Sequence, residues 1–261
     1  MRANPVAGPR MPHLFQPLGD AALRRVLARS PLLAFDFDGT LAPIVPTPQQ
    51  ARTSQSVAGK LGRIAQLLPT MIVTGRHVED VQERIGFEPR YIVGNHGAEF
   101  AAQPAEALAS QLDQARGCLQ RWAGELSDAG VSIEDKGLSL ALHYRLSRHP
   151  EQARELIRRV LEPAGPWCRT FGGKMVENVV PMDAGDKGTA VHRVVAESGV
   201  SCAVFVGDDV NDEPVFASAP PDWLTVRVGR DHASTQARFF LDSTSEVGLM
   251  LDRMLGYLLN S

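Results

Sequence analysis

The stretch LLAFDFDGTLAP, from Leu32 to Pro43, ends an apolar run with two acidic residues, Asp36 and Asp38. A glycine and a threonine follow the second acid. Burying a carboxylate without a partner costs several kcal/mol or more, so these acids need an explanation. The stretch predicts either a cation beside the acids or a strand end at which they are exposed for a chemical purpose.

The composition indicates an ordinary globular protein of 261 residues, with 44% apolar and 22% charged residues and a net charge of −3. Its basic residues are scattered, which argues against binding to nucleic acid or to an anionic membrane. No stretch has the apolar length of a transmembrane helix, and residues 1–19 hold four prolines without a continuous apolar run. We therefore expect a flexible leader over residues 1–19, no signal peptide and a cytoplasmic protein.

The three cysteines, Cys118, Cys168 and Cys202, lie far apart and show neither CxxC nor metal-binding spacing. A sparse, odd set of this kind argues against a disulfide framework and fits a reducing compartment. We expect the three side chains to pack in apolar surroundings.

Apolar periodicity predicts alternating helices and strands over the first hundred residues. Helices are expected at residues 20–29, 57–68 and 78–85, and strands at 70–75 and 90–97. Gly86 is the expected C-cap of the third helix. Strands and helices that alternate with short links indicate parallel βαβ units.

The pattern changes between residues 102 and 180, where two hairpins are predicted. VSIED and LSLALHYR, and then WCRTF and KMVENVV, form two pairs of alternating strands about tight turns. One long helix is expected from Leu108 to Leu126, stopped by Gly130, and another over residues 153–161. The block has the order α-ββ-α-ββ.

From Gly185 onward the parallel pattern returns. A helix is expected at residues 190–199, with strands at 202–209, 224–229 and 238–242. The last helix opens with a capping-box pattern, Ser243 to Glu246. The predicted fold class is α/β, a doubly wound parallel sheet with an α+β block inserted after its third strand. The predicted ranges are 1–101 and 181–261 for the core and 102–180 for the inserted domain.

Polar residues follow four of the apolar runs, and a parallel sheet gathers such residues at one edge. They are Asp36 and Asp38, Thr74, Asn95 and His96, and Asp208 and Asp209. The stretch GDDVNDE is so acidic that its members repel one another unless a cation lies among them. Oxygen ligands without Cys or clustered His favour Mg²⁺ over Zn²⁺. Together with Lys187, this set indicates phosphoryl transfer with an aspartate nucleophile.

Each of these signals has a plainer interpretation when it is taken alone. Asp36 and Asp38 could cap a strand end, Thr74 could be a loop hydroxyl, and Lys187 could be a solvated lysine at a helix start. GDDVND could be a turn held by side-chain hydrogen bonds. Their order along the chain is what favours an active site.

The motifs DFDGT, VTGR, GDKG and GDDVND resemble, in that order, the four motifs of the haloacid dehalogenase (HAD) superfamily of phosphatases. The resemblance spans most of the chain. It implies a HAD-like Rossmannoid core, and it implies that residues 102–180 form what this superfamily calls a C2-type cap, with the order αββαββ.

Within that superfamily the chain is similar to the trehalose-6-phosphate phosphatases. The likeness lies in DGTLAPIVPTPQQA, GNHGAEF, EDKGLSLALHYR, GGKMVENVVP and GDDVNDEPVF. Departures are small: Thr74 stands where serine is common, Asp186 where asparagine often precedes the lysine, and Asn211 where threonine is frequent. The Thr74 hydroxyl can replace that of serine, whereas Asp186 could weaken the local positive field.

This resemblance implies a Mg²⁺-dependent hydrolase of trehalose 6-phosphate, acting last in trehalose biosynthesis. Asp36 would be the nucleophile, Asp38 the general acid and base, and Thr74 and Lys187 would bind the phosphoryl group. The implied metal residues are Asp36, Asp38 through its carbonyl, Asp208, Asp209 and Asp212. The implied substrate residues are Gly75, Arg76, Asn95, His96, Glu134, Lys136, Arg145, Lys174 and Glu177.

Alternation along LSLALHYR places Leu138, Leu140, Leu142 and Tyr144 on one face and Ser139, Ala141, His143 and Arg145 on the other. Charged residues on hairpins are usually solvated, which is the plain alternative for the implied cap contacts.

Two other functions stay open. One is a phosphatase of another sugar phosphate, such as sucrose phosphate or mannosylglycerate phosphate, although the two cap hairpins match the trehalose family better. The other is a non-catalytic sugar-phosphate sensor or regulatory subunit, although the nucleophile, lysine and metal ligands are all present. We expect a monomer that binds a small molecule, and a functional pairing with a trehalose-6-phosphate synthase stays open.

Overall fold

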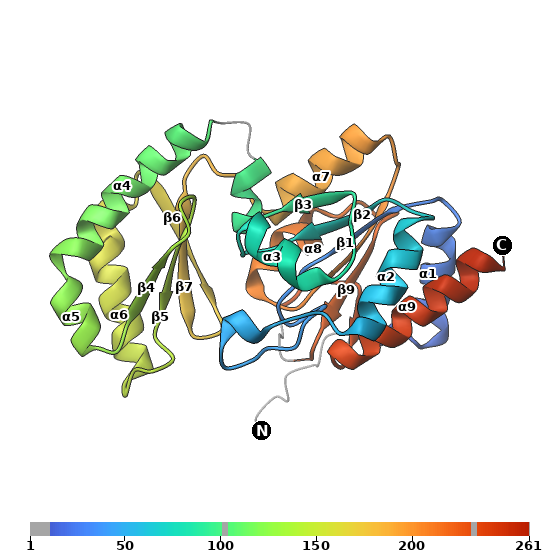
Figure 1. Ribbon diagram of the computed structural model, residues 1–261, viewed down its shortest axis with the longest axis horizontal. Coiled ribbons are helices and arrows are strands. Elements are labelled where there is room, and N and C mark those ends of the chain that lie inside the picture. Colours follow the sequence, from blue (N-terminus) through green and yellow to red (C-terminus); the bar gives the residue numbers. More distant parts are fainter. Residues whose placement is uncertain (1–10, 101–103, 231–233, 261) are drawn as a thin grey trace, which may run out of the picture.

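The computed structural model describes residues 11–100, 104–230 and 234–260, which build two sheets that lie side by side (Figure 1). The parallel sheet has the strand order β10-β9-β8-β1-β2-β3, and the antiparallel sheet has the order β4-β5-β7-β6. The first and last parts of the chain form the parallel sheet, and the middle part forms the antiparallel one (Figure 1). The predicted fold class is therefore confirmed.

The strands of the parallel sheet are short apolar runs. They are β1 (Leu32–Phe35), β2 (Thr70–Val73), β3 (Tyr91–Val93), β8 (Ala203–Gly207), β9 (Leu224–Val228) and β10 (Phe239–Leu241). Every residue of β1, β2, β8 and β9 is buried, as expected for parallel strands covered on both faces. β1 lies inside the sheet, where Leu33 pairs with Thr70 of β2 on one side and with Val204 of β8 on the other.

Amphipathic helices cover this sheet. α1 (Pro17–Leu27), α2 (Gln55–Ala65) and α9 (Thr244–Leu259) gather on one side, and α7 (Lys187–Ser198) packs against α8 (Glu213–Ser218) on the other (Figure 1). α3 (Val78–Ile85) joins β2 to β3 and ends, as predicted, at Gly86 in the left-handed conformation. Short 3₁₀ helices lie at η1 (Pro48–Gln50), η2 (Asn95–Phe100), η3 (Glu162–Ala164) and η4 (Val210–Asp212).

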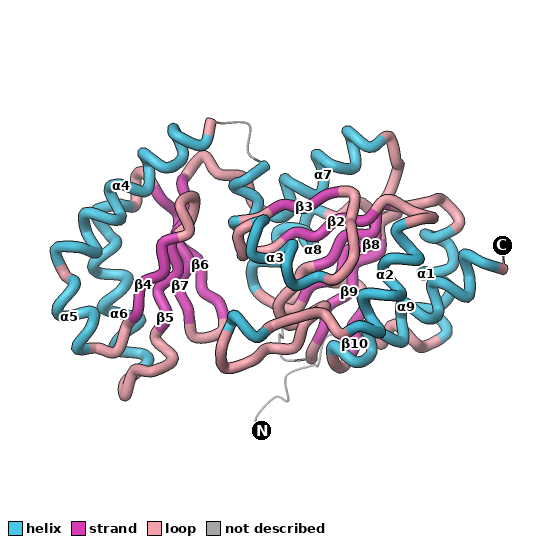
Figure 2. Tube along the Cα trace, viewed as in Figure 1, coloured by secondary structure: helices cyan, strands magenta, loops and turns pink. Residues whose placement is uncertain are grey.

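The middle part of the chain forms a second domain with its own apolar core, which we call the cap. Its elements are α4 (Ala105–Arg121), α5 (Ala123–Asp128), β4 (Ser132–Asp135), β5 (Leu140–His143), α6 (Pro150–Leu161), β6 (Cys168–Gly173) and β7 (Val176–Pro181). The helices cover one face of the cap sheet, and the other face is turned toward the parallel domain (Figure 2). Leu140 and Leu142 belong to the core beneath the helices, as their predicted alternation requires.

Several helices begin or end a few residues away from their predicted bounds, and two of these differences have an identifiable cause. The first begins at Pro17 rather than Asp20, because proline is well tolerated in the first turn, where its missing N–H is not needed. The helix predicted from Leu108 to Leu126 is interrupted at Trp122, whose φ of −112° and ψ of 19° leave the helical region. It therefore becomes the two helices α4 and α5.

The capping box predicted for the last helix is absent. Ser243 is the N-cap residue of α9, but its side chain makes no capping hydrogen bond. The Glu246 carboxylate instead accepts the backbone N–H of Asp242 at 2.6 Å and lies 2.9 Å from His13 Nε2. The glutamate thus ties the start of α9 to the first described residues of the chain.

The predicted leader and linkers are only partly covered by the described residues. Residues 1–10 of the leader lie outside them, and Pro17–Gly19 belong to α1. Residues 101–103 of the predicted linker Phe100–Pro104 also lie outside, whereas β7 extends into the linker predicted at Val179–Asp183. The three cysteines are free and buried, as expected. Within the described part of the chain, no helix is long and apolar enough to cross a membrane.

Candidate active site

The carboxyl ends of β1, β2, β3 and β8 meet at one edge of the parallel sheet. Asp36 follows β1 directly, Thr74 follows β2, and Asp208 follows β8. Asn95 follows β3 after a single glycine, and Lys187 opens α7. The structure therefore gathers at one edge the polar residues that the sequence placed after four strands.

Three buried carboxylates, those of Asp36, Asp208 and Asp212, form the centre of this edge. Oxygen atoms of all three lie within 4.8 Å of one another. The buried ammonium of Lys187 lies 2.8 Å from Asp36 Oδ1 and 2.8 Å from Asp212 Oδ1. Attraction between these charges offsets part of the cost of taking them out of water.

Burial governs the protonation of this cluster. It raises the pKa of Asp36 well above its usual range, while Lys187 acts in the opposite direction and Asp212 adds repulsion. Burial, and then repulsion from Asp212, raises the pKa of Asp208 to about 6. Burial alone would lower the pKa of Lys187, but attraction to Asp212 and Asp36 outweighs it and raises the pKa above its usual value. A further cation among the carboxylates would favour their ionised forms.

The loop after β8 is shaped by its own acidic side chains. Asp212 Oδ2 accepts the backbone N–H groups of Asp208 at 2.8 Å and of Asp209 at 3.0 Å. Asp209 caps η4, where its Oδ1 accepts the N–H of Val210 at 2.8 Å. Gly39 has a φ of 82°, and a Cβ there would lie 2.0 Å from Asp208 Oδ2. The loop can approach the end of β1 only because that position is glycine.

A buried arginine that sequence reasoning missed also holds this loop. Arg227 lies near the end of β9, opposite Gly207. Its Nη2 donates to the Asp208 carbonyl at 2.7 Å, and its Nη1 lies 3.1 Å from Glu213 Oε1. The available signal was a single arginine inside the apolar strand LTVRV, where an unpaired charge would be costly.

The donor atoms at this edge fit a hard divalent cation such as Mg²⁺. Asp208 Oδ1 is buried and has no hydrogen-bond partner among the described residues, and a cation would satisfy such an atom. The cluster of Asp36, Asp208 and Asp212 offers only carboxylate oxygens. The Asp209 carboxylate does not belong to it, and neither does that of Asp38, for which the sequence analysis expected the backbone carbonyl to be the metal ligand.

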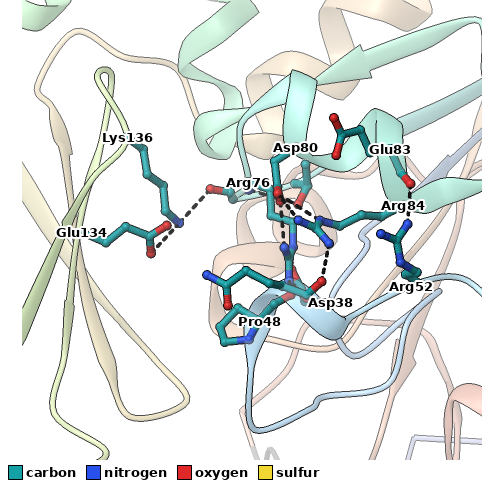
Figure 3. Close-up of polar contacts among 12 residues, drawn as sticks. Asp38, Pro48, Arg52, Arg76, Asp80, Glu83, Arg84, Glu134 and Lys136 are labelled. Atoms are coloured by element: carbon teal, nitrogen blue, oxygen red, sulfur yellow. Dashed lines mark hydrogen bonds and ion pairs between the residues drawn. The ribbon is translucent and has the colours of Figure 1, made fainter.

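Asp38 is held by Arg76 instead (Figure 3). Arg76 Nε and Nη2 lie 2.6 and 2.7 Å from the two oxygens of its carboxylate. The same guanidinium contacts Asp80 at 2.8 Å and donates to the Pro48 carbonyl at 2.9 Å. The Arg76 N–H donates to the fully buried Thr74 hydroxyl at 3.2 Å. Both oxygens of Asp38 are therefore engaged, which holds its carboxylate in one orientation.

The cap sheet contacts this edge through its two hairpins. On the β4–β5 hairpin, Lys136 Nζ lies 3.3 Å from the Gly75 carbonyl, and burial lowers the pKa of Lys136. Nearby, the buried Ser139 hydroxyl donates to Asn95 Oδ1 at 2.6 Å. On the β6–β7 hairpin, Lys174 Nζ lies 2.5 Å from an oxygen of Asp208. The domains are therefore closed on one another.

His96 lies in the seam between the two domains. Its ring packs edge-on against Phe171 of β6, with 5.0 Å between ring centroids, and its Nδ1 lies 3.5 Å from Asn211 Nδ2. Burial lowers the pKa of His96 well below its usual value, and three cations act in the same direction: Lys187, Lys136 and Arg169. The ring is therefore neutral at pH 7.

Two predicted cap residues lie away from this seam. Glu177 pairs in register with Leu142, so it shares the helix-covered face and contacts Arg154 of α6 at 2.6 Å. Its neighbour Asn178 takes the face that we had expected Glu177 to occupy. Arg145 lies in an exposed turn beyond β5. Among the described residues, neither side chain is one of those that contact the parallel domain: Glu177 lies on the helix-covered face, and Arg145 lies beyond the paired residues of β5.

Glu134 lies next to Lys136, the cap residue that reaches the Gly75 carbonyl of the parallel domain. It lies on β4 of the cap, 3.0 Å from His143 Nε2 and 3.8 Å from Lys136 Nζ (Figure 3). The contact with His143 lowers the pKa of Glu134, and Lys136 adds to the effect. The carboxylate is therefore ionised next to the lysine that reaches the Gly75 carbonyl.

A sequence model of the trehalose-phosphatase family matches residues 34–245 of this chain. The trehalose-phosphate phosphatase of Mycobacterium avium (strain 104) is 31% identical over 250 residues, which cover 87% of this chain and 62% of the relative. That of Mycobacterium bovis (strain BCG / Pasteur 1173P2) is 30% identical, covering 94% and 66%. The chain thus spans 62 to 66% of the length of these relatives.

Solved structures agree in fold. A trehalose-6-phosphate phosphatase related protein is 26% identical, with a TM-score of 0.68 and coverage of 86% of this chain and 98% of that one. The C-terminal domain of the C. albicans trehalose-6-phosphate phosphatase is 22% identical, with a TM-score of 0.71 and coverage of 95% and 98%. A HAD-superfamily phosphatase of Bacteroides thetaiotaomicron is 17% identical, with a TM-score of 0.57 and coverage of 87% and 94%. The last two likenesses concern the fold alone, and the expected HAD-like core with a cap is confirmed.

Proposed function

Because this chain belongs to the trehalose-phosphatase family, we propose that it hydrolyses trehalose 6-phosphate to trehalose and phosphate, with Mg²⁺ and through an aspartyl-phosphate. The observation that carries the proposal is the buried set of Asp36, Lys187, Asp208 and Asp212 at the edge of the sheet. It combines a nucleophile, a fixed positive charge and oxygen ligands for a metal, which are the parts that phosphoryl transfer needs.

In the first half of the proposed reaction, an Asp36 oxygen attacks phosphorus and the bond from phosphorus to the sugar oxygen breaks. Asp38 gives its proton to the leaving sugar oxygen. Lys187 and Thr74 bind the phosphoryl oxygens, where an ammonium and a hydroxyl offset the developing charge. Mg²⁺ held by Asp36, Asp208 and the Asp38 carbonyl would neutralise further negative charge on the phosphoryl group.

In the second half, water attacks phosphorus and the bond from phosphorus to Asp36 breaks, which releases phosphate. Asp38 takes the proton of the attacking water and returns to its starting state. Both steps require Asp38 to exchange its contacts with Arg76 for contacts with the reacting oxygen, since Arg76 engages both carboxylate oxygens.

The sugar would lie between the edge of the sheet and the uncovered face of the cap. Charged pairs suit a hydroxyl-rich disaccharide because they supply donors and acceptors together. The proposed contacts are Gly75, Arg76, Asn95, His96, Glu134, Lys136 and Lys174, all of which lie at or near this seam. Such an enzyme would act last in trehalose biosynthesis, after a synthase.

The test is phosphate release from a panel of trehalose 6-phosphate, sucrose phosphate, mannosylglycerate phosphate and an aryl phosphate. We expect the fastest turnover with trehalose 6-phosphate, its loss in EDTA and its recovery with Mg²⁺. Asp36→Asn should reduce release to background, because an amide is not a nucleophile toward phosphorus. Asp222→Asn is the matched control, since Asp222 lies at the surface in an exposed pair with Arg29.

Each part of the proposal has its own contrary result. Equal or faster release from another sugar phosphate would refute the substrate, and full activity in EDTA would refute the metal. Phosphate release by Asp36→Asn at the rate of Asp222→Asn would refute the nucleophile.

A further inference from the structure

Lys174 of the cap contacts the carboxylate cluster of the parallel domain. It stands in the turn between β6 and β7, and its Nζ lies 2.5 Å from Asp208 Oδ2. Its side chain is 50% exposed, whereas the side chain of Asp208 is 3% exposed. A partly solvated lysine of one domain therefore pairs with a buried carboxylate of the other.

The β6–β7 hairpin lies directly over the loop that carries Asp208. A Cβ added at Gly173 would lie 3.3 Å from Asp209 Oδ2, so the hairpin backbone is in contact with the loop. The turn itself is tight, with Met175 in the left-handed conformation at a φ of 64°. Packing of the hairpin brings Lys174 over Asp208, and the Lys174–Asp208 pair in turn helps to hold the hairpin against the loop.

The two lysines at the cluster divide its carboxylates between them. Lys187, which belongs to the parallel domain, contacts Asp36 and Asp212. Lys174, which belongs to the cap, contacts Asp208. Burial opposes the charge on Lys174, but attraction to Asp208 raises its pKa above the usual value. Each of the three buried carboxylates thus has an ammonium partner, and one of these partners belongs to a different domain.

We propose that Lys174 is the counter-ion of Asp208 in the metal-free protein, and that Mg²⁺ and the closed β6–β7 hairpin compete for this carboxylate. The inference rests on the Mg²⁺ site of the proposed function. An ammonium and a divalent cation next to one carboxylate repel each other strongly in a buried site. Metal loading therefore releases Lys174 from Asp208 and loosens the hairpin, and Lys174 becomes available to an incoming anionic substrate.

The β4–β5 hairpin has no part in this competition. Among the described residues, its polar contacts with the parallel domain run from Lys136 to a backbone carbonyl and from Ser139 to Asn95, and neither involves a cluster carboxylate. Metal loading should therefore change the seam locally, at residues 168–181, and leave the other hairpin docked. This asymmetry is specific to the proposed competition, because general opening of the cap would free both hairpins.

The first measurement is calorimetric Mg²⁺ affinity of substrate-free protein after EDTA treatment. Lys174→Met keeps the length of the side chain and removes its charge, so Mg²⁺ no longer displaces a charge-assisted contact. We expect affinity to rise roughly tenfold, the scale of one such contact. Lys60→Met is the matched control, because Lys60 Nζ lies 2.6 Å from the Asp252 carboxylate on another part of the surface. This control should bind Mg²⁺ like the wild type.

The second measurement is hydrogen exchange with and without Mg²⁺ and without substrate. In the wild type, Mg²⁺ should speed exchange in the β6–β7 turn and leave the β4–β5 hairpin unchanged. In Lys174→Met the turn should exchange quickly in both conditions. Thermal melting in EDTA checks that the variant is folded.

The outcomes separate this inference from the function on which it rests. Wild-type affinity, or weaker affinity, in a folded Lys174→Met variant would overturn the competition and leave the metal site standing. Slower exchange of the turn on Mg²⁺ binding would also overturn it. A wild type that binds no Mg²⁺ would overturn both the inference and the metal dependence of the proposed function.

Discussion

Lys187→Met tests the buried charge cluster without any reference to activity. The substitution roughly preserves volume but removes the ammonium that Asp36 and Asp212 share at 2.8 Å. Breaking a buried ion pair by removing one partner costs about 3–5 kcal/mol, because the remaining charge stays buried. Here two partners are left, so we expect the free energy of unfolding of the parallel domain to fall by at least that amount in EDTA at pH 8.

The loss should shrink as the pH is lowered. Burial already raises the pKa of Asp36, and loss of Lys187 removes the attraction that opposes this shift. A carboxyl whose pKa is higher in the folded state than in the unfolded state binds protons preferentially when folded. Lowering the pH through the raised pKa therefore restores stability to the variant.

Urea unfolding followed by the fluorescence of Trp223 would measure this change. Trp223 is 4% exposed in the core of the parallel domain and stacks on His192, whereas Trp122 and Trp167 lie on the cap. Replacing the two cap tryptophans by phenylalanine in every variant leaves a probe of the parallel domain alone. A loss of 3–5 kcal/mol should lower the midpoint by about 1–2 M urea.

Two further variants make the result decisive. Adding Asp212→Asn to Lys187→Met removes one unpaired carboxylate and should recover part of the loss. Lys60→Met breaks a lysine–carboxylate pair at the surface and should cost less than about 1 kcal/mol. A midpoint for Lys187→Met equal to that of Lys60→Met at pH 8 would refute the argument from buried charge.

Two other residues give separate predictions. The pKa of His96 lies well below its usual value, so the unfolded chain binds the extra proton first, and stability should fall as the pH drops below about 6.5. In His96→Asn the urea midpoint should change less with pH below about 6.5 than it does in the wild type. An unchanged dependence on pH would contradict the explanation by burial. Arg227→Met removes the hydrogen bond to the Asp208 carbonyl and so frees the loop that carries Asp208. Mg²⁺ binding should weaken about tenfold, the scale of one charge-assisted hydrogen bond. A purely electrostatic role predicts stronger binding instead, and calorimetry distinguishes the two.

The parallel domain could be predicted from sequence because each buried strand is a continuous apolar run followed by polar residues. The place of Asp36 and Asp208 at the site could be predicted from one rule, that the carboxyl ends of parallel strands meet at the same edge of the sheet. Arg227 was missed because a single arginine in an apolar strand carries no motif. Its partners, the Asp208 carbonyl and the Glu213 carboxylate, come from another part of the chain, which local sequence patterns do not reveal.

The cap was predictable in its elements but not in all its faces. In KMVENVV both Glu177 and Asn178 are polar, so alternation alone does not tell which one faces the substrate side. The answer depends on which residue of β5 lies opposite, and register places Glu177 beside Leu142. Likewise, the break at Trp122 involves neither glycine nor proline. Arg76 and Asp38 follow different strands, so no local sequence pattern predicts the ion pair between them.

The central position of β1 has a consequence for synthesis on the ribosome. One edge of β1 pairs with β2 soon after both have been made, but the other edge waits for residues 203–206. At the usual speed of translation, about 5–20 residues per second, the gap lasts roughly 10 to 30 s. All strands of the cap sheet emerge within that interval. During this interval the nascent chain holds a complete cap beside a parallel sheet in which one edge of β1 is unpaired, and an unpaired strand edge is prone to pairing with other chains.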